Sequence, residues 1–249
     1  MKPLFKQLFL AVAACVLFVA PVLATNCNTP PAPVICPIGQ IATKGVCAQP
    51  TPDQGLALLQ EGNRDYVKWN LLHLAFYANP AARTQLATSQ HPYAIVLSCS
   101  DSRVPPEVVF DKGLGEIFTV RVAGNVVAPH ELGSIEYAIE HLGANLIVVL
   151  GHERCGAVTA TYNAYPGHVE GNIGSLTESI YPAVKAVVGT DPKDTNQSAQ
   201  IEECILENIT QVKESLLENE LIKPLVEAGT LKVVGAKYDL DTGIVTFQQ

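Results

Sequence analysis

Two unbroken apolar runs, each followed directly by ionisable residues, constrain the fold of this chain more than any other feature. The runs are Tyr93 to Ser98 (YAIVLS) and Asn145 to Gly151 (NLIVVLG). Between them, Glu131 to Leu142 carries leucine and isoleucine at helical spacing. Unbroken apolar strands that alternate with helices are typical of a parallel sheet covered on both faces. The sequence therefore predicts an α/β fold with a mostly parallel central sheet flanked by helices.

The rest of the chain after residue 53 fits the same single domain. Apolar residues at helical spacing between Leu56 and Leu72 predict an N-terminal helical arm of one or two helices before Asn79-Pro80. Further elements are expected at Ile117 to Val122 (strand), Ile201 to Leu217 (helix), and Leu231 to Tyr238 with Ile244 to Phe247 (a closing hairpin). The catalytic domain is accordingly predicted to span residues 54–249.

The N-terminus has the pattern of a secretory signal. Lys2 and Lys6 precede an apolar stretch, Leu8 to Val19, and small residues follow at Val22-Leu23-Ala24. A short membrane anchor is the alternative, but a bilayer span needs about 20 residues. We expect residues 1–24 to be a cleaved signal peptide. The mature protein would then be periplasmic (or secreted), with no stable membrane insertion.

Residues 25–53 are rich in proline and cysteine, which predicts an extended arm without a core of its own. The chain has seven cysteines, and cleavage would remove Cys15. In an oxidising compartment the remaining even number suggests disulfides. One or two bridges are expected among Cys27, Cys36, Cys47 and Cys204, and the pairing stays open.

Charge excludes some classes of partner. The net charge is −8, and the chain has no basic run and no basic patch rich in aromatic residues. Because phosphate backbones and anionic lipids attract basic surfaces, nucleic acid and anionic membranes are not expected as partners.

The two apolar runs end in residues that commonly bind metals. Cys99 follows the first run, and His152 and Cys155 follow the second. In open α/β sheets, sites form beyond the carboxyl ends of the strands. If the two strands are neighbours, two thiols and an imidazole meet in the pattern of a zinc site with an open fourth position. The alternatives are buried filler residues or, after export, a Cys99–Cys155 disulfide.

Four segments resemble the β-class carbonic anhydrases: CSDSRVPPE (99–107), RVAGN (121–125), GSIEYA (133–138) and GHERCGAV (151–158). The likeness runs from about Leu56 to the C-terminus and is closest to bacterial, exported members. The resemblance implies one Zn²⁺ per chain on Cys99, His152 and Cys155. It also implies an Asp101–Arg103 dyad and a homodimer or dimer of dimers.

The activity implied is reversible hydration of carbon dioxide to bicarbonate and a proton, by attack of zinc-bound hydroxide. Zinc lowers the pKa of bound water from about 15.7 to about 7. Asp101 would accept a hydrogen bond from the hydroxide, and Arg103 would keep Asp101 ionised. In a closed state Asp101 would instead be a fourth ligand, so activity should rise with pH. The alternative for this dyad is a structural ion pair.

The resemblance also assigns substrate-binding roles to Gln90, Phe118 and Tyr137, which in the family meet across the dimer interface. Ordinary packing is the alternative for the two aromatic residues. One departure concerns a regulatory bicarbonate pocket of some bacterial relatives. Val96 replaces its tryptophan, although Arg121 matches its arginine. We therefore expect the accessible-site type without that pocket.

Three competing functions follow from the same residues. Carbon disulfide or carbonyl sulfide hydrolysis would use the same fold and zinc. A non-catalytic zinc-binding protein would be expected to lack the dyad, whereas Asp101 and Arg103 are both present. A thiol redox role is disfavoured because the sequence has no Cys-x-x-Cys pair.

Overall fold

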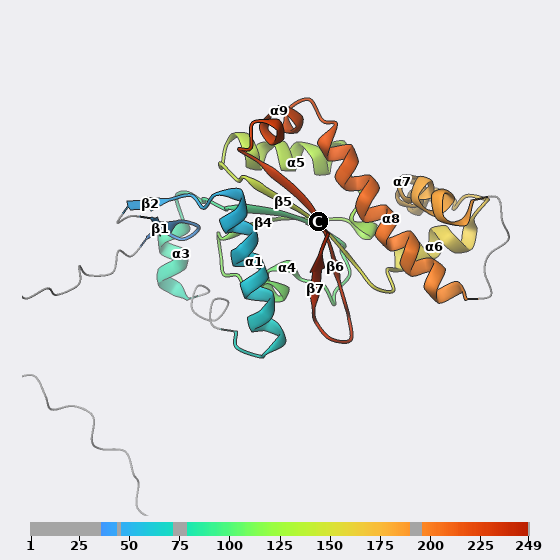
Figure 1. Ribbon diagram of the computed structural model, residues 1–249, viewed down its shortest axis with the longest axis horizontal. Coiled ribbons are helices and arrows are strands. Elements are labelled where there is room, and N and C mark those ends of the chain that lie inside the picture. The colour runs from blue at the N-terminus through green and yellow to red at the C-terminus, as the bar shows by residue number, and fades with distance from the viewer. Residues whose placement is uncertain (1–35, 44–45, 72–78, 190–195, 249) are drawn as a thin grey trace, which may run out of the picture. The chain divides into compact units, whose positions relative to one another are not determined.

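The computed structural model describes residues 36–43, 46–71, 79–189 and 196–248. Its centre is a sheet flanked by helices (Figure 1). The sheet has five strands in the order β4-β3-β5-β6-β7. Only β7 runs antiparallel to its neighbour. The strands are β3 Ala94–Ser98, β4 Ile117–Arg121, β5 Leu146–His152, β6 Lys232–Tyr238 and β7 Val245–Phe247. The mostly parallel sheet expected from the apolar runs is confirmed.

The strands β3 and β5 are adjacent and parallel, and every residue in both is buried. Ser98 pairs with Leu150, so the carboxyl ends of the two strands lie at the same edge. On its other side β3 pairs with β4, and Ser98 lies opposite Arg121. This register brings the segments that follow β3 and β5 together.

Helices cover both faces of the sheet, which explains why the central strands are apolar on both sides and do not alternate with polar residues. They are α1 Pro52–Val67, α3 Pro80–Leu86, α4 Pro106–Val109, α5 Pro129–Glu140, α6 Gly156–Ala164, α7 Gly171–Val188, α8 Gln197–Leu217 and α9 Ile222–Glu227. Ile95 and Leu97 of β3 face a core shared with α5, α6, α7 and α8. Val96, between them, faces a second core shared with α1 and α4. In Figure 1, α8 crosses the sheet beside β5 and β6.

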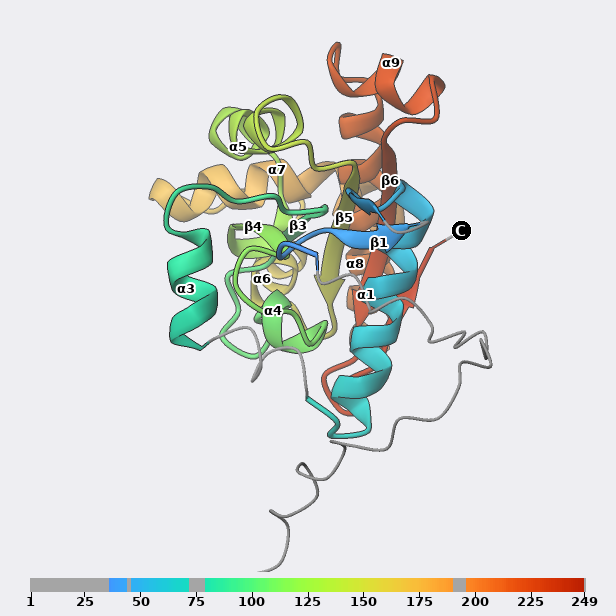
Figure 2. The ribbon, with the colours of Figure 1, turned by 90° about the vertical axis from the view of Figure 1, so that its left-hand side faces the viewer.

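The described part of the N-terminal arm forms a small hairpin and is not simply extended. Strands β1 Ile41–Thr43 and β2 Val46–Ala48 pair antiparallel, and a Cys36–Cys47 disulfide closes the hairpin. Figure 2 shows the hairpin beside the beginning of α1. Gly39 approaches the carbonyl oxygen of His91 so closely that a Cβ would lie 2.0 Å from it. The hairpin is therefore packed directly onto the segment that precedes β3.

The expected helices and strands agree with the observed ones to within a few residues at each end. The helix α1 begins at Pro52, because the side chains of Thr51 and Gln54 form a capping box at its start. It therefore includes the last two residues assigned to the arm. The helix α7 was not predicted, and it contains Pro182. The proposed signal peptide, Cys27 and Leu72 lie outside the described residues. Among the helices that are described, none has the length and apolar character needed to cross a membrane.

Candidate metal centre

Cys99, His152 and Cys155 converge at the carboxyl ends of β3 and β5. One donor atom from each side chain lies within 4.8 Å of the others. Cys99 follows β3 directly, His152 is the last residue of β5, and Cys155 caps the N-terminus of α6. Zinc bonds of about 2.0–2.3 Å would place such donors about 3.5–4 Å apart, so the cluster has suitable dimensions. The convergence expected from the strand order is confirmed.

His152 is fully buried, and its two ring nitrogens differ in their surroundings. Nδ1 lies 2.8 Å from the backbone oxygen of Glu153. A carbonyl can only accept, so Nδ1 carries a proton, and in the neutral imidazole the lone pair is then on Nε2. Nε2 has no hydrogen-bond partner among the described residues. An acceptor buried without a partner costs free energy unless something binds it, so this arrangement fits a metal ligand.

Both thiols are buried and free, so the Cys99–Cys155 disulfide considered above is not formed. A hydrogen bond from the Cys155 side chain is the largest factor that lowers the pKa of Cys99, to about 4. The backbone N–H of Gly124 also donates to Cys99 Sγ, at 3.3 Å. The hydrogen bond to Cys99 is likewise the main reason why the pKa of Cys155 is raised. The two sulfurs thus share a hydrogen bond, and a divalent cation would suit this cluster by replacing the shared proton.

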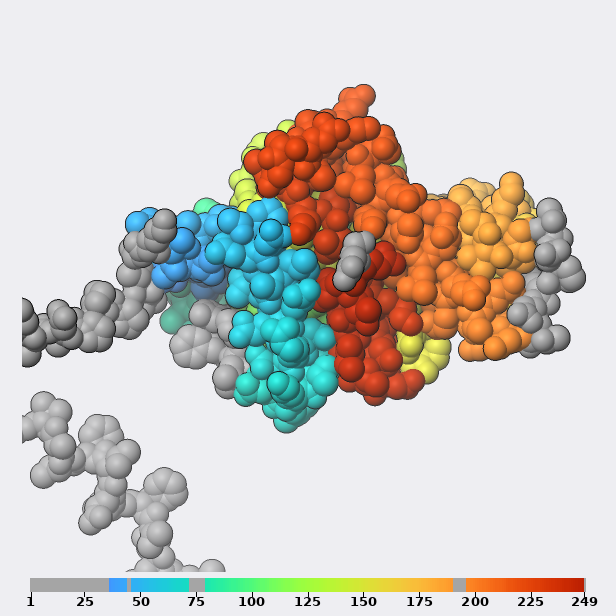
Figure 3. Space-filling model, in the orientation of Figure 1, coloured from blue at the N-terminus to red at the C-terminus, as the bar shows by residue number. Residues whose placement is uncertain are grey.

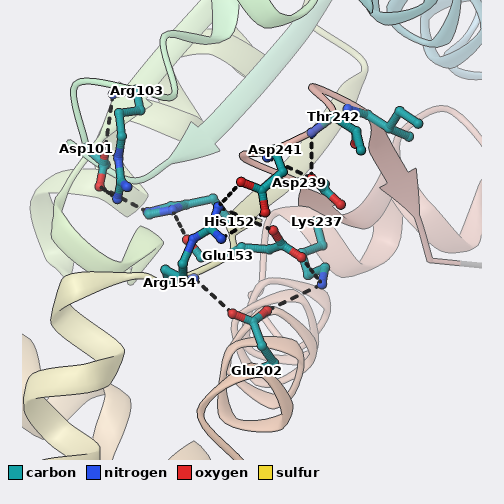
Figure 4. Close-up of polar contacts among 11 residues, drawn as sticks. Asp101, Arg103, His152, Glu153, Arg154, Glu202, Lys237, Asp239, Asp241 and Thr242 are labelled. Atoms are coloured by element: carbon teal, nitrogen blue, oxygen red, sulfur yellow. Dashed lines mark hydrogen bonds and ion pairs between the residues drawn. The ribbon is translucent and has the colours of Figure 1, made fainter. Parts of the chain in front are cut away.

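Asp101 and Arg103 form a bidentate ion pair beside His152, as shown in Figure 4. Arg103 Nε donates to Asp101 Oδ1 at 2.9 Å, and Arg103 Nη2 donates to Oδ2 at 2.7 Å. These bonds hold the pKa of Asp101 far below its usual value. Asp101 Oδ2 lies 3.9 Å from His152 Nε2. An ionised carboxylate therefore lies next to the histidine nitrogen that would bind a metal.

Arg121 supports the loop that carries these residues. Its Nε donates to the carbonyl of Cys99 at 3.1 Å, and its Nη2 donates to that of Asp101 at 2.6 Å. Val96, at the position where some relatives have tryptophan, is fully buried in the second core. Within this chain, Arg121 binds the backbone of the loop between β3 and α4.

Gly124 and Asn208 contribute to the site although the sequence did not single them out. Gly124 has a φ of 77°, in the left-handed region, and lies against α6 and α7. The buried Asn208 side chain of α8 donates to the Gly124 carbonyl at 2.9 Å. The RVAGN segment was a signal for Gly124, but Asn208 is 84 residues away in the sequence. Together they aim a backbone N–H at the Cys99 sulfur.

The three residues assigned to substrate binding, Gln90, Phe118 and Tyr137, do not meet at the cluster within the described part of one chain. Phe118 packs against the core that contains Cys99 and Cys155. Gln90 lines a surface pocket with Ser89 and Gly115. Tyr137 is 48% exposed and lies against the ring of His141. In the described part of one chain, no hydrogen bond or ring contact links these three residues to the cysteines or to His152.

An open α/β sheet that gathers two thiols and an unpartnered imidazole nitrogen at the ends of adjacent parallel strands defines a class: an α/β protein with a metal centre of the cysteine–histidine–cysteine type. The comparisons with known proteins narrow this class to one family.

A family model described as carbonic anhydrase matches residues 94–245. The carbonic anhydrase of Mycolicibacterium smegmatis is 37% identical over 193 residues, which cover 75% of this chain and 88% of that protein. The β-carbonic anhydrase CcaA has a similar structure, with a TM-score of 0.62 and 25% identity, covering 78% of this chain and 87% of CcaA. A tetrameric β-carbonic anhydrase from Sordaria macrospora also has a TM-score of 0.62, at 24% identity, covering 68% and 86%. This chain belongs to the carbonic anhydrase family and is an enzyme of the β class, as its signature segments indicated.

Proposed function

We propose that this enzyme catalyses the zinc-dependent, reversible hydration of carbon dioxide to bicarbonate and a proton. One zinc ion per chain would be held by Cys99, His152 and Cys155. The observation that carries this proposal is the buried cluster of these three donors, whose histidine nitrogen has no other partner among the described residues. The named activity of the relative that is 37% identical supports the same reaction.

The side chains around the cluster have roles that suit this reaction. Bound zinc would acidify a water molecule and so supply hydroxide near neutral pH. Asp101 is ionised and would accept the nucleophile's proton in a hydrogen bond, which turns a lone pair toward carbon. Arg103 orients this carboxylate through two hydrogen bonds. Since Asp101 Oδ2 lies 3.9 Å from His152 Nε2, Asp101 is also the proposed alternative fourth ligand.

The substrate pocket is proposed to form between two chains. Gln90, Phe118 and Tyr137 would provide an amide and an apolar wall for carbon dioxide, which offers little to hydrogen-bond. The exposed rings of Tyr137 and its neighbour His141 leave surface for a second copy. A homodimer or a dimer of dimers is therefore proposed for this chain. Light scattering would measure the assembly, and a monomer with full activity would exclude a shared pocket.

Export to the periplasm, or secretion, is proposed from the N-terminal sequence. The Cys36–Cys47 disulfide supports this proposal, because such bonds persist in oxidising compartments. Fractionation of the native host and sequencing of the mature N-terminus would test it. A protein that retains residues 1–24 in the cytoplasm would contradict it.

The decisive experiment measures metal content and carbon dioxide hydration on the same preparation. We expect one zinc per chain and rapid hydration in a stopped-flow pH-indicator assay. Carbon disulfide and carbonyl sulfide should be assayed beside it, although no observation favours them. A pure protein that folds and binds zinc but does not hydrate carbon dioxide would overturn the proposal.

A further inference from the structure

The peptide unit between Glu153 and Arg154 makes a hydrogen bond at each end. Its carbonyl oxygen accepts from His152 Nδ1 at 2.8 Å. Its N–H donates to Glu202 Oε1 at 2.9 Å. Glu202 belongs to α8 and lies 48 residues after Arg154 in the sequence. A carboxylate, a peptide unit and the imidazole of a proposed metal ligand thus form one continuous line of hydrogen bonds (Figure 4).

Lys237 holds the Glu202 end of this line, and the backbone of β6 holds the turn through Glu153. Lys237 Nζ lies between two carboxylates, 3.3 Å from Glu153 Oε1 and 3.4 Å from Glu202 Oε2. The N–H of Glu153 donates to the carbonyl of Tyr238 at 3.1 Å. Glu202 is therefore held by β6 while its other oxygen receives the Arg154 N–H.

The Arg154 side chain makes a different and more exposed contact. Its guanidinium binds both oxygens of Asp241 at 2.9 and 3.0 Å, but the Asp241 side chain is 72% exposed. Because both side chains are largely exposed, solvent and salt screen this ion pair. Asp241 lies in the turn between β6 and β7, which Figure 3 shows at the surface between α1 and α8. Glu153, Asp239 and Asp241 also lie close together, but Arg154 and Lys237 contact this acidic group, so it is an ion-pair network.

The backbone of Arg154 adds a reason why the turn needs support. Its φ is 52°, a left-handed conformation that is costly for a residue with a side chain. This turn must carry the chain from His152 to Cys155 with both side chains directed at one point. The hydrogen bond to Glu202 stabilises the strained residue through its N–H group.

We propose that Glu202 is a positioning residue for the metal ligand His152, acting through the Glu153–Arg154 peptide. This inference rests on the proposed function, in which His152 binds zinc. A negative charge at the N–H end strengthens the carbonyl as an acceptor, because hydrogen bonds in a chain polarise one another. The stronger acceptor holds the Nδ1 proton and leaves Nε2 more basic and correctly directed. Ligating histidines commonly have such a partner, and here a peptide unit lies between them.

Substitutions at Glu202 test this role through metal binding. Glu202→Ala removes the acceptor, and Glu202→Gln keeps its size and a neutral acceptor oxygen. Zinc affinity would be measured by competition with a chelator, and the visible spectrum would be recorded on the cobalt-substituted protein. We expect Glu202→Ala to weaken zinc binding roughly 10- to 100-fold. Glu202→Gln should restore part of the affinity, and cobalt bands should shift in the alanine variant.

Two matched controls separate this effect from charge and from the side chain of Arg154. Glu203→Gln removes an equal charge from the exposed neighbouring position on α8. Asp241→Asn weakens the guanidinium contact but leaves the peptide's bond to Glu202 intact. Both controls should bind zinc within about twofold of the unaltered protein, since neither alters the hydrogen-bond line.

The results distinguish this inference from the proposed function. If the unaltered protein binds no zinc, the proposed function fails. If it binds zinc and hydrates carbon dioxide while Glu202→Ala and Glu202→Gln match the controls in affinity and cobalt spectrum, only the role of Glu202 fails. Thermal melting of the metal-free variants detects a purely structural effect. A lowered melting temperature with an unchanged cobalt spectrum and zinc affinity would also overturn the role.

Discussion

Single residues around the cluster divide into those that would bind a metal ion and those that orient the groups around it. Cys99, His152 and Cys155 supply donor atoms, whereas Arg103, Arg121, Gly124 and Glu202 hold the groups that face them. Most of these orienting contacts are hydrogen bonds to backbone atoms. Substitutions at the orienting residues should therefore act on the metal site indirectly, through the groups that these residues hold.

Replacing Asp101 by asparagine should reduce catalysis without removing the metal. An amide keeps the size of the side chain but loses the charge that Arg103 binds. In the proposed mechanism this charge also strengthens the hydrogen bond that Asp101 accepts from the nucleophile. We expect kcat to fall by about 10²- to 10³-fold, as when one catalytic hydrogen bond is removed. Stopped-flow hydration and zinc analysis of the same sample would measure both quantities. Full activity in Asp101→Asn would reduce this dyad to a structural ion pair.

Replacing Gly124 by alanine should destabilise the protein and weaken zinc binding. The left-handed φ of 77° costs about 1–2 kcal/mol for alanine. In addition, the new Cβ would lie 2.5 Å from Cδ1 of Ile180. Gly143 is a matched control, because its φ is 75° but nothing lies within 4 Å of a Cβ there. Urea unfolding should show the larger loss for Gly124→Ala, and equal losses would contradict the packing argument.

At the scale of elements, the sequence predicted those parts whose pattern is local. The apolar runs were sufficient to predict the strands β3 and β5, and the spacing of apolar residues was sufficient to predict the helix α8. The helix α7 was missed because Gly171, Gly174 and Pro182 interrupt its helical pattern, whereas burial of Ile180 and Val184 stabilises it. Propensity is a weak guide wherever tertiary packing dominates.

The candidate site was predictable to a similar extent. Its three donors lie at or just beyond the ends of two strands, a position that the apolar runs of the sequence indicate. Asn208 and Glu202 reach the site from α8, 84 and 48 residues away from their partners. No spacing rule connects such distant residues, so their contacts with the site can be identified only in the folded structure.

The Cys36–Cys47 hairpin should stabilise the segment before β3. Besides Gly39, the arm contacts this segment through Gln49, whose Nε2 donates to the Pro92 carbonyl at 2.8 Å. Cys36→Ser combined with Cys47→Ser should lower the free energy of unfolding by about 2–3 kcal/mol, because a short closed loop is released. Chemical unfolding would measure this loss.

Reduction by a phosphine provides the matching control for the hairpin. It should lower the melting temperature of the unaltered protein but not that of the double variant. An equal fall in the melting temperature of both proteins would mean that reduction acts at a site other than the Cys36–Cys47 disulfide.

At the scale of the whole molecule, bound zinc should contribute to stability because the candidate site joins two central strands, β3 and β5, to the helix α6. A ligand that binds only the folded state adds about 2.7 kcal/mol at a free concentration one hundred times its dissociation constant. Removing zinc with a chelator should therefore lower the melting temperature measured by calorimetry. Cys155→Ser should abolish most of the shift, and an unchanged melting temperature after removal from the unaltered protein would contradict a site in this cluster.

The pairing of one disulfide with two buried free thiols in the same chain has a consequence for maturation. Cys99 and Cys155 are close enough to be oxidised together, while Cys36 and Cys47 must be oxidised for the hairpin to close. Thiolates bound to a metal are shielded from that reaction. A newly made chain in an oxidising compartment would thus have to acquire its ion before an oxidant reaches the second pair, and the order of these two events would decide how much of the protein becomes active.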